Sequence, residues 1–125
     1  MKLIDSCVWA EVLQGSPTGK LFKPLMPTPA QLLVPTMVLY EVSKWLARTM
    51  DSQAADEVMI TLQSAKVVDA TSSIALQAAE LSITYKLHAI DALIYATALE
   101  HDAVLVTCDA HFKGLPQVEY TAKVK

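Results

Sequence analysis

Short apolar runs alternate along this chain with longer segments in which apolar residues recur at helical spacing. Runs of four or five residues have the length of buried strands, and the segments between them are long enough to cross from one strand to the next. This alternation predicts a parallel sheet wrapped by helices. The expected strands lie at residues 2–5, 31–34, 66–69, 103–107 and 118–121.

The segments between the runs carry signals of helix starts. Ser6, Thr36 and Thr71 each precede apolar residues at helical spacing, and we expect them to cap three helices. Further helices are expected around residues 18–25, 52–64 and 90–100. The last is apolar almost all round apart from Asp91, which predicts a central, buried helix with one acid in its first turn.

Composition restricts the class of protein. The chain has 125 residues, 53% of them hydrophobic, with only three Gly and six Pro. These values exclude a disordered or collagen-like chain and predict one globular domain over residues 1–125. The net charge of −3 gives no overall field to attract a polyanion, so a nucleic acid would have to be met by local positive charges or by a metal ion.

The sequence also predicts a location. The longest hydrophobic run, residues 92–96, is far shorter than the roughly 18 residues of a membrane-spanning helix. An acid at the fifth position leaves no apolar stretch of signal-peptide length, and Cys7 and Cys108 are isolated thiols without a Cys-x-x-Cys pair. We therefore expect a cytoplasmic protein whose cysteines are small packing residues.

Four acids lie where a parallel sheet gathers functional groups, beyond the carboxyl ends of its strands. Packed together, such carboxylates would raise one another's pKa, so the pocket requires a cation, and oxygen ligands favour Mg²⁺ or Mn²⁺. Asp5 and Asp109 follow expected strands, Glu41 lies one turn into a helix, and Asp91 begins the buried helix.

Each acid also has a purely structural interpretation. Asp5 and Asp109 suit turns or helix caps, and Glu41 suits a surface pair with Lys44. Asp91 is the hardest to explain in this way, because an unpaired acid on an apolar helix costs several kcal/mol.

The segments around these acids resemble the four acidic motifs of PIN-domain ribonucleases. They are Leu3-Ile-Asp-Ser-Cys-Val-Trp9, Glu41 on its helix, Asp91-Ala-Leu-Ile-Tyr-Ala-Thr-Ala98 and Leu105-Val-Thr-Cys-Asp-Ala-His-Phe112, in the family's order. The likeness is closest to the toxin half of VapBC toxin–antitoxin pairs and spans nearly the whole chain. It implies a three-layer α/β/α fold with a central, mostly parallel sheet of four or five short strands.

The same resemblance implies a metal-dependent endoribonuclease, normally a homodimer and held inactive by a cognate antitoxin. Mg²⁺ or Mn²⁺ held by Asp5, Asp91 and Asp109, with Glu41 bound directly or through water, would orient a water for in-line attack on a phosphodiester. Ser6 and Thr107 resemble hydroxyl positions beside the family's acids, although capping and strand propensity explain them about as well. RNA rather than DNA as substrate rests on the resemblance alone.

Basic and aromatic residues around Glu41 leave two interpretations open. Lys44 and Arg48 share roughly its helix face, and they either hold a phosphate backbone or form a solvated face. The set of Trp9, Tyr40, Trp45 and Leu46 forms either an exposed groove for a partner helix or part of the core. The histidines at 88, 101 and 111 lack metal-ligand spacing and are expected at the surface or at helix ends.

Two other functions compete with the ribonuclease. A receiver-like signalling domain would use Asp5 and Asp69 as a metal-binding acid and a phosphorylation site. That class requires two adjacent acids after the first strand, and Asp5 is followed by Ser6. An inactive PIN-like binding module has no need of four acids, so their presence favours the enzyme.

Overall fold

A computed structural model describes residues 1–125 and contains one five-stranded sheet in which every pairing is parallel. Its order is β3-β2-β1-β4-β5, so the first strand lies in the centre. This confirms the predicted α/β class. The strands are β1 (Lys2–Ile4), β2 (Leu32–Pro35), β3 (Lys66–Val68), β4 (Val104–Thr107) and β5 (Val118–Tyr120).

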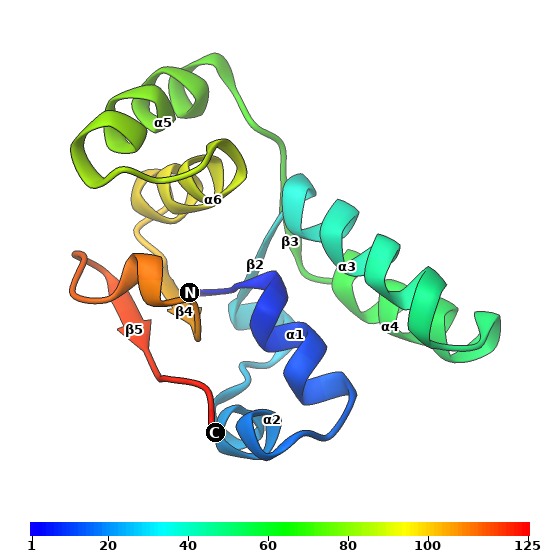
Figure 1. Cartoon of the computed structure of the whole chain (residues 1–125). Helices are drawn as coiled ribbons and strands as arrows, with labels where there is room; N and C mark the ends of the chain where they lie inside the picture. The colour runs from blue at the N-terminus through cyan, green and yellow to red at the C-terminus, as the bar shows by residue number, and fades with distance from the viewer.

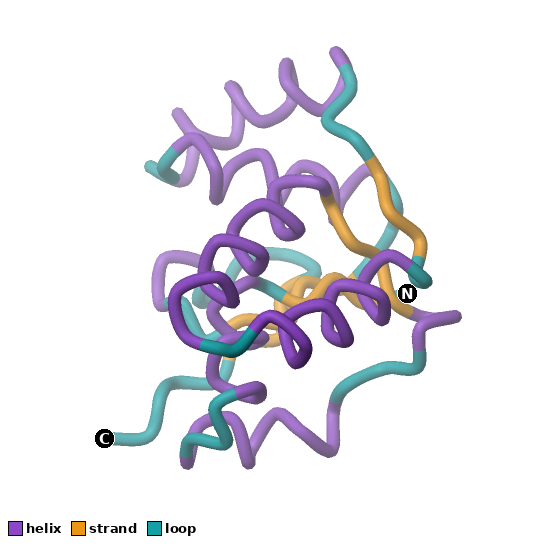
Figure 2. The backbone as a smooth tube through the Cα atoms, turned by 90° about the vertical axis from the view of Figure 1, so that its right-hand side faces the viewer, coloured by secondary structure: helices purple, strands orange, loops and turns teal.

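Six α-helices connect and cover the strands. In Figure 1, α5 and α6 lie together at the upper left, α3 and α4 at the right, and α1 and α2 below. Figure 2 shows helices in front of the strands and others behind them, which gives the expected three layers. The helices are α1 (Ser6–Leu13), α2 (Pro17–Phe22), α3 (Thr36–Thr49), α4 (Ser52–Gln63), α5 (Ser72–Tyr85) and α6 (Ala89–Glu100), with short 3-10 turns at Lys23–Leu25, Pro29–Gln31 and Ala110–Phe112.

A single apolar core lies between these layers. It takes both faces of the central strands and one face of most helices, and α6 contributes the most, as its all-round apolar sequence predicts. Tyr95, Phe22 and Phe112 are its largest fully buried side chains. None of the helices combines the length and apolar character needed to cross a membrane.

Some element boundaries differ from those predicted. Asp5 rather than Ser6 caps α1, because the strand ends at Ile4 and the Asp5 carboxylate accepts a hydrogen bond from the Ser6 N–H (2.8 Å). Thr36 is the first residue of α3 rather than its cap, and the extended Pro35 precedes it. Thr71 caps α5 as expected, with its hydroxyl accepting from the Ile74 N–H.

The sheet order places a crevice beside β1. The chain passes from β1 to β2 on one side and later returns to β4 on the other, so the segments that follow β1 and β4 lead to opposite edges of the sheet. Such a switch point opens a crevice beyond the carboxyl ends of the strands. Asp5 and Asp109 follow these two strands and therefore stand at its edges.

Gly19 allows α2 to approach α1 closely. A Cβ at this position would overlap the carbonyl group of Glu11 and lie 2.9 Å from the Cα of Val12, and both are backbone atoms that cannot move aside alone. We expect Gly19→Ala to lower the free energy of unfolding by about 3 kcal/mol, measured by urea denaturation. The exposed neighbour Lys20 provides the control, because Lys20→Ala should change stability by less than about 0.5 kcal/mol. Equal stability of both variants would contradict the close approach.

Candidate functional site

Asp5 is a buried carboxylate held in place by three donors. It is 4% exposed, and its oxygens accept hydrogen bonds from the Ser6 N–H (2.8 Å), the Thr107 hydroxyl (2.7 Å) and the Cys7 thiol (3.5 Å). Burial raises the pKa of Asp5 from 3.8 to about 6, although the hydrogen bond from Thr107 opposes the rise. The charge of Asp91 raises it further, so the two carboxylates lie close enough to repel each other.

Glu41 joins the site through Ser6. The Ser6 hydroxyl donates to the Glu41 carboxylate (2.9 Å), which ties the first residue of α1 to the second turn of α3. Glu41 is half-buried, so its carboxylate reaches the crevice from the side of α3 while Asp5 lies at the foot of α1.

The charge of Asp91 interacts with the charges of the other three acids. It lies in the first turn of α6, and partial burial followed by the charges of Asp109 and Glu41 raises its pKa, while His111 and His88 lower it. Because Asp91 also raises the pKa of Asp5, its carboxylate is within electrostatic range of the other three acids. The structure thus brings together the four acids that sequence analysis singled out.

Thr107 connects the acids of the two central strands. Its hydroxyl donates to Asp5 and accepts a hydrogen bond from the main-chain N–H of Asp109 (3.0 Å), and its side chain is fully buried. Asp109 in turn caps the 3-10 turn and accepts from the main-chain N–H of His111 (2.9 Å). Thr107 therefore fixes the position of one carboxylate directly and of the other through the backbone.

The donor atoms fit a divalent cation. Ligand atoms of Asp91, Asp109 and His111 all lie within 4.8 Å of one another. Burial first, and then neighbouring negative charges, raise the pKa values of Asp5 and Asp91, and a bound cation would offset both effects. Asp5 and Glu41 lie outside this closest group, and each accepts a hydrogen bond from a protein hydroxyl.

Sequence analysis missed His111. It was expected at the surface, and its side chain is indeed 62% exposed, yet its Nδ1 lies 2.9 Å from the Asp109 Oδ1. His88, also exposed, packs edge-on against the His111 ring, with 5.9 Å between ring centroids. A search for histidines spaced relative to one another cannot find this residue, because its position relative to Asp109 is what matters. His101 caps the far end of α6, away from the acids.

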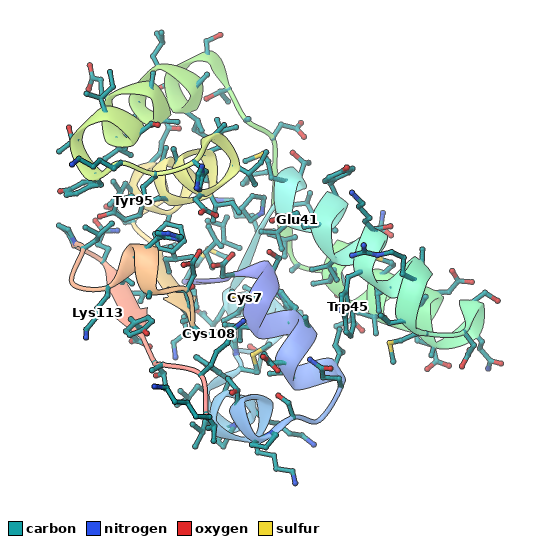
Figure 3. All side chains as sticks on the ribbon, in the orientation of Figure 1. Cys7, Glu41, Trp45, Tyr95, Cys108 and Lys113 are labelled. Atoms are coloured by element: carbon teal, nitrogen blue, oxygen red, sulfur yellow. The ribbon has the colours of Figure 1, made fainter.

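A groove between α1 and α3 leads from the acids across the surface. It encloses about 240 Å³, and Glu41, Trp45 and Arg48 line it from α3 while Ser6, Cys7 and Ala10 line it from α1. Figure 3 labels Glu41, Trp45 and Cys7 along this path. Arg48 therefore lies on the groove, whereas Lys44 is exposed outside it, with its ammonium 5.8 Å from the centre of the Tyr40 ring.

Sequence analysis left open whether four residues around Glu41 form a groove or belong to the core, and the structure places some of them in each. Trp9 and Leu46 are buried, Trp45 lines the groove, and Tyr40 is 62% exposed. Neither single interpretation of the set is therefore right.

The two cysteines are isolated in sequence but not in space. Their sulfur atoms lie 3.2 Å apart at the centre of the molecule (Figure 3). The hydrogen bond between them and burial raise the pKa of Cys7, while the same hydrogen bond lowers the pKa of Cys108. Cys108 is buried in the core and Cys7 packs against the core from α1, in agreement with the predicted packing role.

Comparisons with known proteins agree with this geometry. The model of the PIN domain family matches residues 2–117. No curated protein matches the chain.

Several solved structures have the same fold. A toxin–antitoxin complex from Klebsiella pneumoniae is 23% identical with a TM-score of 0.81, over 95% of this chain and 96% of that one. VapBC2 from Rickettsia felis, solved with a DNA fragment from its promoter, is 16% identical with a TM-score of 0.71, over 95% and 97%. VapC20 from Mycobacterium tuberculosis, described as a toxin that cleaves the sarcin–ricin loop, is 21% identical with a TM-score of 0.71, over 93% and 95%.

At these identities the solved structures establish the fold alone. The match to the family model covers nearly the whole chain and therefore establishes the family. The matched residues include β1, the acid-bearing starts of α1, α3 and α6, and the turn after β4. The chain belongs to the PIN-domain family.

Proposed function

We propose that this protein is a Mg²⁺- or Mn²⁺-dependent endoribonuclease and the toxin of a type II toxin–antitoxin pair. The observation that carries the proposal is the position of Asp91 among the acids. Burial and then the charges of Asp109 and Glu41 raise its pKa, and its own charge raises the pKa of Asp5. A protein selected for stability alone gains nothing from four carboxylates in mutual repulsion. Their cost is explained if a cation binds there.

Each residue has a distinct part in this proposal. Asp91 and Asp109 offer free carboxylate oxygens to the ion, with Asp5 as a further ligand and Glu41 bound directly or through water. A divalent ion held by these residues would supply Lewis-acid activation of a water and would neutralise charge on the phosphate oxygens. One of the carboxylates accepts the proton of the attacking water, and the leaving group is the ribose 3′ oxygen. Ser6 and Thr107 hold Glu41 and Asp5 at their positions.

The choice of RNA as the substrate and the assignment of the toxin role rest on the resemblances to other proteins. The matching structures include a toxin–antitoxin complex, a VapBC2 structure and a toxin described as cleaving the sarcin–ricin loop. On this chain, Arg48 lines the groove beside Glu41, where its guanidinium can bind a backbone phosphate. Lys44 is exposed one turn earlier and can contact the same strand outside the groove.

The proposal includes partners and a location. We assign a cognate antitoxin that blocks the site, and the cytoplasm as the compartment where both RNA and antitoxin occur. A small upstream open reading frame that encodes a DNA-binding protein would support the toxin role. Its absence would weaken that role without affecting the nuclease.

Removal of divalent ions should abolish cleavage. We expect the purified chain to cut a structured RNA with Mg²⁺ or Mn²⁺ present and to show no detectable cleavage in EDTA, with recovery on re-addition of the ion. The measurement is gel analysis of an end-labelled RNA, with a DNA of the same sequence alongside. Cleavage that persists in EDTA would contradict the proposed chemistry. Preferential cutting of the DNA would contradict the assigned substrate.

The protein should be a homodimer in solution. Ile60, Leu76 and Ile83 are 68%, 72% and 82% exposed, which is a high exposure for large aliphatic side chains. Self-association would remove such surface from water. Light scattering at micromolar concentration should give twice the chain mass of 13.6 kDa. A mass of one chain at that concentration would reject the dimer.

A further inference from the structure

We propose that His111 is a ligand of the divalent ion, so that the site is a mixed nitrogen and oxygen site that prefers Mn²⁺ to Mg²⁺. This inference rests on the proposed metal-dependent function. It goes beyond that function because an all-carboxylate site has no reason to discriminate strongly between the two ions, whereas a nitrogen donor does.

The distance between His111 and Asp109 fits two neighbouring ligands of one ion. Their Nδ1 and Oδ1 atoms are 2.9 Å apart. In an octahedral shell with ligands at about 2.1 Å, adjacent donor atoms are about 3 Å apart and opposite ones about 4.2 Å. The limit of 4.8 Å that contains the donor atoms of Asp91, Asp109 and His111 is compatible with both spacings. An ion can therefore bind to both of these donor atoms as adjacent ligands.

The His111 ring is held in this orientation by its surroundings. Its main-chain N–H donates to the same Asp109 oxygen, which fixes the turn that carries the ring. The His88 ring packs against the His111 ring in a T-shaped arrangement. The following residue, Phe112, is fully buried and anchors the turn to the core. An exposed histidine with these three restraints is positioned before any ion arrives, and such preorganisation reduces the cost of binding.

A nitrogen donor changes which ion the site accepts. Mg²⁺ is a hard cation that retains waters and oxygen ligands, whereas imidazole suits transition metals, and Mn²⁺ accepts both kinds of donor. The carboxylates of Asp91 and Asp109 are good ligands for either ion. His111 is therefore the residue in this group that determines the preference.

The test removes the nitrogen donors of residue 111 and keeps an aromatic ring at that position. His111→Phe retains the packing against His88 but offers no donor, and since the side chain is exposed, thermal melts without metal should match the wild type. His101→Phe is the matched control at the far end of α6. Calorimetric titration of each full-length protein with MnCl₂ or MgCl₂ alone gives both affinities. Pulsed electron paramagnetic resonance of the Mn²⁺ complex reports directly whether a nitrogen nucleus is coordinated.

For the wild type and His101→Phe, we expect tighter binding of Mn²⁺ than of Mg²⁺ and a nitrogen coupling. In His111→Phe the coupling should vanish, and the ratio of Mn²⁺ to Mg²⁺ affinity should fall by about tenfold. An unchanged ratio and no nitrogen coupling in the wild type would overturn the His111 ligand while leaving the metal-dependent nuclease intact. A wild type that binds neither ion would overturn the metal site, and with it the proposed function.

Discussion

Asp91→Asn should reduce RNA cleavage by about 100-fold or more while leaving the metal-free protein at least as stable as the wild type. The loss follows because the amide removes a charged ligand of the ion. Stability holds because the ionised Asp91 carboxylate destabilises the metal-free folded state. Burial and the charges of Asp109 and Glu41 raise its pKa, and nothing in the protein donates a hydrogen bond to it. A neutral isostere relieves that repulsion, and the smaller loss of a favourable carboxylate at a helix N-terminus opposes it only in part.

The opposite result is expected of a structural acid. If Asp91 stabilised the fold through a buried partner, the amide would leave that partner unmatched and lower stability by about 1–3 kcal/mol. Thermal melts in EDTA and in Mn²⁺, together with a cleavage assay, separate the two cases. The wild type should be stabilised by Mn²⁺ and the variant much less, since only a ligand that binds the native state shifts the equilibrium.

Asp102→Asn is a suitable control for this experiment. Asp102 is exposed just after α6 and has a φ of 51°, a conformation that Asn tolerates well. It should melt and cleave like the wild type. An Asp91→Asn variant that melts earlier in EDTA yet cuts RNA at the wild-type rate would show that Asp91 is structural.

The convergence of the acids was predictable because strand ends in a parallel sheet meet at one edge. Asp5 and Asp109 each follow a strand, and β1 pairs directly with β4, with Ile4 opposite Val106. Asp91 was predictable for a different reason, since one acid on an otherwise apolar helix is costly without compensation. Both arguments depend on periodicity and strand ends, which are properties that a sequence records.

The features that sequence analysis missed depend on geometry across elements. Cys7 and Cys108 are distant along the chain, and their contact follows only from the order in which β1 and β4 pair. His111 lies in a 3-10 turn, where neither the strand period nor the helix period says which way a side chain points. Ser6 was assigned the α1 cap because serine is a strong capping residue, but Asp5 is equally strong and comes one residue earlier.

The metal-free protein should lose stability as the pH rises from about 4 to about 7, and Asp5 should account for most of the loss. The pKa of Asp5 is about 6 in the folded state against 3.8 for the exposed group. Between these values the folded state holds a proton that the unfolded state has released, so raising the pH favours unfolding. The difference of about two pKa units corresponds to a loss of about 3 kcal/mol in the free energy of unfolding, complete above about pH 7. The raised pKa of Asp91 acts in the same direction.

Asp5→Asn isolates this effect, because the amide keeps the shape of the side chain and does not titrate. We expect the free energy of unfolding of the variant, measured by urea denaturation in EDTA, to exceed that of the wild type near pH 7 and to lose the advantage near pH 4. The gain should be somewhat below 3 kcal/mol, since one hydrogen bond to the carboxylate, worth about 1 kcal/mol, is weakened. Saturating Mn²⁺ should reverse the order at pH 7, because the ion compensates the wild-type charge and the variant lacks that ligand. Parallel pH profiles for the two proteins would show that Asp5 carries no buried charge, and the electrostatic argument for a cation at this position would then fail.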